Sequence, residues 1–189
     1  MPADTVPMTG SVHLLGHAGY ATWITGSGTG CSRWKGLAVT RWRARQAGNE
    51  QGGHVFVRDA QAATFWSASA QPCGGAVRVW RDEAMQRCAR HDGAITTTLE
   101  VAVDPDQPVE VRGIGLHNDG AVARELELTS YLELLLGSAQ GDASHPAYSK
   151  MFVQTAFEHV VVEQGVLLAW RRKKDPAEPD IWAAHALVV

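Results

Sequence analysis

The stretch ITTTLEVAV, residues Ile95–Val103, decides the fold class of this chain. Its apolar residues recur at every second position. Ile95, Leu99, Val101 and Val103 share one face with Thr97, while Thr96, Thr98 and Glu100 point the other way. A period of two is the signature of a β-strand with one buried face and one solvated face. The stretch therefore predicts a half-buried strand.

Turn signals and further strand patterns extend outward from this segment. Asp92-Gly93 precedes it, and Asp-Gly is among the strongest hairpin dipeptides. DPDQP, residues 104–108, follows it as a second turn. Strands are expected at residues 20–24, in a hairpin over 54–66, at 109–116 and 123–136, in a hairpin over 158–172 that turns near Gln164-Gly165, and at 181–189.

The run ARELELTSYLELLL, residues 123–136, needs a choice between helix and strand. Leucine and glutamate are good helix formers. At helical spacing, however, the apolar residues would surround the helix, whereas at period two leucines and glutamates separate onto opposite faces. The run is therefore predicted to be one strand.

Short strands separated by turns at a spacing of roughly 8 to 12 residues indicate an all-β antiparallel sandwich. We expect residues 1–13 to form a tail and residues 14–189 to form a single β-sandwich domain. The chain ends in the strand-like IWAAHALVV, so the domain is expected to be an incomplete piece of a larger multidomain enzyme. Four tryptophans within strand patterns are expected in the core: Trp66, Trp80, Trp170 and Trp182.

Composition argues against several functional classes. The net charge of −3 is unlike that of a nucleic-acid-binding protein. Three cysteines without CxxC spacing predict neither a disulfide framework nor a zinc site, and they favour a reducing, cytoplasmic setting. No apolar run approaches the roughly 18–20 residues of a membrane span. MPADTVPMTG lacks the features of a secretion signal, so no membrane contact by this segment is expected.

The glycine-rich GSGTG, residues 26–30, raises the question of a phosphate cradle. A dinucleotide site requires G-x-G-x-x-G at the start of a helix, and a Walker loop requires Gly-Lys-Ser/Thr. Neither pattern is present. We therefore interpret the segment as a hairpin loop, and no cofactor is expected.

Arginine and tryptophan alternate just after this loop, at Arg33-Trp34 and Arg41-Trp42-Arg43. Period two places Trp42 in the core while Arg41 and Arg43 reach outward. A guanidinium beside an indole suits anionic or sugar ligands, since it combines fixed donors with a stacking surface. The alternative is a strand whose arginines pair with surface carboxylates.

A second polar cluster, SHPAYSK, follows the segment SAQGDA and is interpreted as a binding loop. Pro146 restricts the preceding residue to an extended conformation. The loop would offer His145, Tyr148, Ser149 and Lys150. No G-x-S-x-G motif is present, and the acidic residues show no pair typical of glycoside hydrolysis. The chain alone is therefore expected to be non-catalytic.

Six blocks in a fixed order, running from about Leu14 to the last residue, resemble one family. It is the β-sandwich domain that precedes the catalytic barrel in inverting glycoside phosphorylases related to cellobiose phosphorylase. Within this family, the region of bacterial cyclic β-1,2-glucan synthases is the most similar. The blocks are GYATWITGSGTGCSRWKGLAVTRWR, VFVRDAQAATFWSASAQP, ITTTLEVAVDPDQPVEVRGIGLHNDG, RELELTSYLELLL, SHPAYSKMFVQTAF and IWAAHALVV.

The resemblance implies a large super-sandwich, similar to the galactose mutarotase fold, followed by an (α/α)6 barrel that carries the general acid. It implies that this domain packs on the barrel, supports a homodimer and contacts β-glucan, in a parent enzyme attached to the inner membrane. The family pattern matches residues 29–34, with Cys31 in place of the usual tyrosine. The alternative function is a free-standing carbohydrate-binding module.

Overall fold

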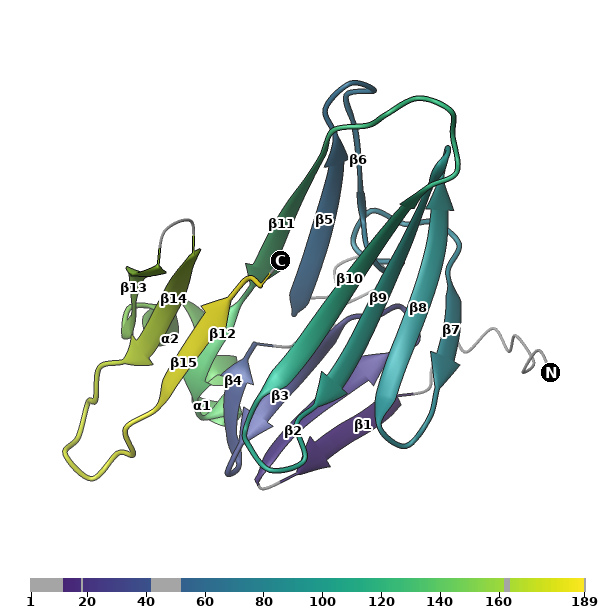
Figure 1. Ribbon diagram of the computed structural model, residues 1–189. Helices are drawn as coiled ribbons and strands as arrows, with labels where there is room; N and C mark the ends of the chain where they lie inside the picture. Colours follow the sequence, from purple (N-terminus) through teal and green to yellow (C-terminus); the bar gives the residue numbers. More distant parts are fainter. Residues whose placement is uncertain (1–11, 18, 42–51, 162–163, 189) are drawn as a thin grey trace.

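The computed structural model describes residues 12–17, 19–41, 52–161 and 164–188. Within these residues the chain forms fifteen strands and two short helices. The strands pair in four antiparallel sheets (Figure 1). The prediction of an all-β fold is confirmed.

Sheet I has the order β1 (Val12–His17), β2 (Tyr20–Thr25), β3 (Gly30–Trp34), β4 (Leu37–Thr40) and β12 (Leu134–Gly137). Sheet II has the order β10 (Glu110–Asn118), β9 (Ile95–Val103), β8 (Met85–Asp92) and β7 (Arg78–Arg81). Sheet III has the order β11 (Leu126–Leu132), β5 (Gly53–Asp59) and β6 (Thr64–Ser67). Sheet IV has the order β13 (Val153–Val161), β14 (Gln164–Arg171) and β15 (Trp182–Ala186).

Sheet II forms one layer of the sandwich, and sheets I and III lie against it (Figure 1). One core cluster joins Leu15 and Ile24 of sheet I to Leu99 of sheet II. A second joins Val57 of sheet III to Ile95 of sheet II. Sheet IV lies to one side, where it packs on β4 and β12 through a third cluster.

The strand that decided the fold class is confirmed as β9, with the predicted bounds. Ile95, Leu99 and Val101 are buried. Thr97 lies on the same face and is also buried, and its hydroxyl accepts a hydrogen bond of 2.9 Å from the indole N–H of Trp66. A buried indole N–H requires such a partner. The hydroxyl on the core face is thus satisfied by the opposing sheet.

The two predicted glycine-containing turns, Asp92-Gly93 and GSGTG, each connect the two strands of a hairpin. Asp92 pairs with Ile95, and Gly93 between them has a φ of +60°, which favours glycine. GSGTG joins β2 to β3, which pair antiparallel. Because a strand and not a helix follows the loop, the interpretation as a hairpin loop is confirmed.

The predicted strand over residues 123–136 is wrong as a single element. The chain forms β11 in sheet III and then β12 in sheet I, with a break at Glu133. At this break the Glu133 carbonyl accepts a hydrogen bond of 2.6 Å from the backbone N–H of Arg41. The alternation of leucines is compatible with both strands, so it carries no signal for the change of sheet.

The predicted binding loop is also wrong in its backbone structure. It forms two short helices, α1 (Ala139–Ser144) and α2 (Pro146–Lys150). Ser138 caps α1, because its hydroxyl accepts a hydrogen bond of 3.3 Å from the Gly141 N–H. Pro146 begins α2, a position where the missing N–H costs nothing. The expected turn near Gln164-Gly165 also shifts, since β14 already begins at Gln164.

The expectation that four tryptophans fill the core holds for Trp66, which is 4% exposed. It is wrong for Trp80 and Trp182, which are 37% and 61% exposed. Trp170 is half-buried and stacks on Trp182, with ring centroids 4.9 Å apart. Trp170 and Trp182 are cross-strand partners, so they share the face of sheet IV that the core residue Ala169 does not occupy.

A buried carboxylate ties sheet I to sheet II. Glu110 of β10 accepts hydrogen bonds from the Tyr20 hydroxyl at 2.9 Å and the Ser32 hydroxyl at 2.7 Å. Arg112 Nε donates to it at 2.6 Å. Burial opposes ionisation of Glu110, but the charge of Arg112 and these hydrogen bonds outweigh it and hold its pKa below the usual value.

Replacement of this carboxylate is expected to destabilise the fold. Glu110→Gln leaves the Arg112 guanidinium without its counter-charge, so the free energy of unfolding should fall by about 3 kcal/mol. Chemical denaturation measures it. Glu127→Gln is the matched control, because its pair with Arg58 is exposed and should contribute less than about 1 kcal/mol. Equal losses in the two variants would contradict the assigned role of Glu110.

Candidate functional site

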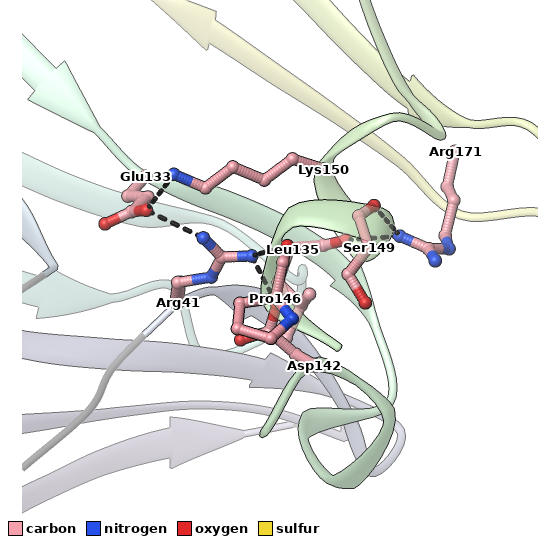
Figure 2. Close-up of polar contacts among 8 residues, drawn as sticks. All are labelled: Arg41, Glu133, Leu135, Asp142, Pro146, Ser149, Lys150 and Arg171. Atoms are coloured by element: carbon pink, nitrogen blue, oxygen red, sulfur yellow. Dashed lines mark hydrogen bonds and ion pairs between the residues drawn. The ribbon is translucent and has the colours of Figure 1, made fainter. Parts of the chain in front are cut away.

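The predicted site residues around the end of β4 meet in a buried ionic cluster (Figure 2). Arg41 is 2% exposed, so the prediction that it reaches outward is wrong. Its Nη1 donates to Glu133 Oε1 at 2.9 Å, and its Nη2 donates to Asp142 and, at 3.2 Å, to the Pro146 carbonyl. One guanidinium thereby joins β4 to the β11–β12 junction and to both helices.

Lys150 completes this cluster. Its ammonium lies 2.7 Å from Glu133 Oε1, the same oxygen that accepts from Arg41. Burial opposes ionisation of Glu133, but the hydrogen bonds and charges of Lys150 and Arg41 hold the pKa of this carboxyl below its usual value. Glu133 is therefore a fixed anion at neutral pH and is poorly suited to act as a general acid.

Ser149 and His145 stabilise the helices through their backbone carbonyls, which accept hydrogen bonds. Ser149 is buried, and its carbonyl accepts a hydrogen bond of 3.0 Å from Arg171 Nη1, which also donates to the Leu135 carbonyl at 3.2 Å (Figure 2). The His145 carbonyl accepts from the Ser149 N–H at 3.0 Å, while the imidazole is exposed. Arg171 thus holds α2 against sheet IV, and only the His145 ring is presented to solvent.

Tyr148 faces outward from α2 and belongs to an exposed aromatic group. Its side chain is 51% exposed and meets Phe152 edge to face, with ring centroids 5.1 Å apart. Lys174 Nζ lies 4.5 Å from the Tyr148 centroid and 4.6 Å from that of Phe152. Aromatic rings beside an ammonium offer both a stacking surface and a hydrogen-bond donor.

Arg33 and Trp34 point to opposite faces of β3. Arg33 is exposed, and its guanidinium lies 5.2 Å from the ring centroid of Trp23. Trp34 packs against the core cluster of Leu136 and Ala169. The two side chains therefore lie on different surfaces of sheet I. Trp42 and Arg43, the remaining predicted site residues, lie outside the described residues.

Sequence reasoning missed the partners of these residues. Glu133 and Asp142 are distant from Arg41 in the chain, and Phe152 and Lys174 were not singled out beside Tyr148. Only Glu133 carried a local signal, because it is a charged residue within a run of leucines. Such a charge requires a partner wherever the run is buried.

Histidine, cysteine and acidic side chains are the groups that a metal site or a reactive thiol would need. In the part of the chain that the structure describes, no group of three or more His, Cys, Asp or Glu residues is placed to hold a metal ion. Cys88 is buried, and burial raises the pKa of its thiol to about 11, which makes it a poor nucleophile. None of the described helices has the length and apolar character to span a bilayer.

Comparison with known proteins identifies the family to which this chain belongs. Residues 3–189 match the family model described as "Glycosyl hydrolase 94, supersandwich domain", so this chain belongs to that family. The cyclic beta-(1,2)-glucan synthase NdvB of Rhizobium meliloti (strain 1021) is 34% identical over 175 residues. The match covers 91% of this chain but only 6% of the relative. The resemblance found in the sequence is confirmed at the level of the family and the fold.

Removal of the central guanidinium tests the ionic cluster. Arg41→Gln removes the buried guanidinium that pairs with both Glu133 and Asp142, so the free energy of unfolding should fall by about 3–5 kcal/mol. Denaturant titration of the chain measures the change. Arg58→Gln removes an arginine from an exposed pair and should cost less than about 1 kcal/mol. If Arg41→Gln were equally mild, the cluster would not hold these elements together.

The depressed pKa values predict loss of stability in acid. Glu133 and Glu110 have pKa values in the folded state below the ordinary 4.5, so the unfolded chain binds more protons as the pH falls through this range. The free energy of unfolding should therefore be highest above about pH 4.5 and fall as the pH drops through the two folded-state values.

Denaturant titrations at a series of pH values measure the slope of the free energy of unfolding against pH. Glu133→Gln should reduce it by up to one proton, or about 1.4 kcal/mol per pH unit. Glu127→Gln, which removes a carboxylate from an exposed ion pair, is the matched control. If Glu133→Gln had the same pH slope as the parent chain, the lowered pKa assigned to Glu133 would be contradicted.

Proposed function

We propose that this chain is a non-catalytic accessory domain of an enzyme that synthesises or phosphorolyses β-1,2-glucan. The observation that carries the proposal is the identity of 34% over 91% of the chain to a protein named cyclic beta-(1,2)-glucan synthase. Membership of the supersandwich family supports the same role. The catalytic groups would then belong to a barrel elsewhere in the polypeptide.

The state of the buried carboxylates supports the non-catalytic role. Glycoside cleavage needs a protonated acid beside the scissile bond and, in hydrolysis, a second carboxylate open to substrate or water. Glu133 and Asp142 are instead paired with Arg41, and Glu110 is paired with Arg112. All three are buried or nearly buried, and their charges are occupied by structural ion pairs.

Exposed aromatic side chains support roles in packing and glycan contact. Trp182 is 61% exposed and stacks on Trp170, an arrangement typical of surfaces that contact another partner. We assign this face of sheet IV to packing on the catalytic barrel and in the homodimer. Tyr148, Phe152 and Lys174 are the proposed glycan contact, because flat rings stack on the C–H faces of sugars. The free cysteines are consistent with the cytoplasmic location proposed for this domain.

The second candidate is a free-standing carbohydrate-binding module. The exposed group around Tyr148 favours it too, because that group needs no other domain to be accessible. The two functions differ in what the isolated chain does. A module binds glycan strongly alone, whereas an accessory domain gains stability or affinity when its downstream residues are restored.

Titration with β-1,2-linked gluco-oligosaccharides tests the proposal. Tryptophan emission and calorimetry should show saturable binding that is selective over cellobiose. Tyr148→Ala should weaken the binding by about tenfold, the loss expected for one aromatic stacking contact. Tyr131→Ala, an equally exposed tyrosine on β11, is the matched control. A flat response from a folded sample would contradict glycan contact, and phosphorolysis by this chain alone would contradict both candidate functions.

A further inference from the structure

The outer face of sheet I carries a solvent-open hollow of about 520 Å³. It lies over β1, β2 and β3, on the side of the sheet opposite Ile24 and the core. Leu14, Trp23 and Arg33 are among the residues that line it. This volume falls within the range of roughly 300–1,000 Å³ that is usual for small-molecule sites.

Cross-strand pairing explains why the hollow exists. Leu14 pairs with Trp23, and in the next row Gly16 pairs with Ala21, which pairs with Arg33. The second row therefore has two minimal side chains between larger neighbours. A Cβ at Gly16 would lie 2.8 Å from the Tyr20 carbonyl oxygen and 2.9 Å from the Ala21 Cβ, so a larger residue there would not fit. The backbone thus keeps the floor of the hollow open.

Arg33 provides an available positive charge at this site. The Trp23 ring, 5.2 Å from its guanidinium carbon, holds the side chain at the wall by a cation–π contact. Across the described part of the chain, no carboxylate forms an ion pair with Arg33, whereas Arg41, Arg58 and Arg112 all have one. Among the lining residues there is no Asp or Glu, and His17 is the second basic group.

The buried carboxylate of Glu110 does not form an ion pair with Arg33. Glu110 lies on the core side of sheet I, where it accepts hydrogen bonds from Tyr20 and Ser32. Its charge is already opposed by Arg112, whose Nε lies 2.6 Å away. The outer hollow therefore combines the Arg33 guanidinium with the apolar side chains of Leu14 and Trp23, above a floor of small residues.

We propose that this hollow binds a sugar that carries an anionic group. The phosphate or carboxylate pairs with the Arg33 guanidinium, which suits oxyanions because its donors form a planar fork. The sugar ring occupies the hollow against Leu14 and Trp23. Such a ligand differs in charge and in place from the neutral glucan assigned to Tyr148, so the inference does not depend on the proposed function.

The indole N–H signal of Trp23 in a ¹⁵N-labelled chain, assigned from Trp23→Phe, reports occupancy directly. The probes are glucose 6-phosphate, glucuronate, glucose and inorganic phosphate. Both anionic sugars should shift the signal with saturation, and the stronger of the two identifies phosphate or carboxylate as the preferred group. Glucose and inorganic phosphate should each bind at least about tenfold more weakly, since each lacks one half of the ligand.

Variants at two positions, Arg33 and Ala21, locate the binding. Arg33→Gln should weaken it by about tenfold or more, because a charge-assisted hydrogen bond is lost, and Arg33→Lys should recover part of that loss. Ala21→Leu should block the hollow. Arg58→Gln, which removes an exposed arginine on sheet III, is the matched control and should bind as the parent chain does.

The inference would be overturned by an unmoved Trp23 signal with both anionic sugars, by equal binding of glucose, or by undiminished binding in Arg33→Gln. Inorganic phosphate binding as tightly as the sugars would reduce the site to a simple anion contact and would reject the sugar. A titration with neutral β-1,2-gluco-oligosaccharides, read at Tyr148, separates failure here from failure of the proposed function.

Discussion

The buried guanidinium of Arg41 is the interaction on which the arrangement of the second half of this chain depends. A charge that is removed from water needs partners, and no single neighbouring segment supplies them. Arg41 forms ion pairs with Glu133, 92 positions away in the chain, and with Asp142, 101 positions away. These contacts coincide with the point where the leucine-rich run leaves sheet III and enters sheet I (Figure 2). The helices α1 and α2 then follow where Asp142 and Lys150 can reach the same cluster.

Two of the ionic centres among the described residues join elements that are distant in sequence. Glu110 ties sheet II to sheet I, whereas Arg41 ties sheet I to the helices. Three apolar clusters lie between and around them. The hydrophobic clusters provide the bulk of the burial, but they tolerate alternative pairings of similar shape. The charged groups tolerate few, because each misplaced partner leaves an unpaired charge in the interior.

This use of charge separates the inside of the domain from its functional surfaces. The acidic groups that could resemble a catalytic pair, Glu110, Glu133 and Asp142, are engaged in structural pairs. The chemically available groups lie outside, on the outer face of sheet I and around sheet IV. There, aromatic rings lie beside basic side chains, as Trp23 does with Arg33 and Tyr148 with Lys174.

Features that depend on adjacent residues were determined by the sequence alone. The period of two in residues 95–103 predicted β9, and the Asp92-Gly93 and GSGTG segments predicted hairpins. Strand alternation and turn preference are local, because they arise from the pleat and from backbone conformations open to glycine. The order of six sequence blocks likewise predicted the family.

The tertiary structure alone decided which faces are covered. Alternation says which residues share a side of a strand, but it does not say what packs against that side. Arg41 was therefore expected in solvent and is buried, and Trp182 was expected in the core and is exposed. Burial depends on partners such as Glu133 and Asp142, which approach only after the sheets have assembled. No local sequence pattern encodes the approach of these carboxylates to Arg41. The approach is favoured because an unpaired charge in the interior would cost free energy.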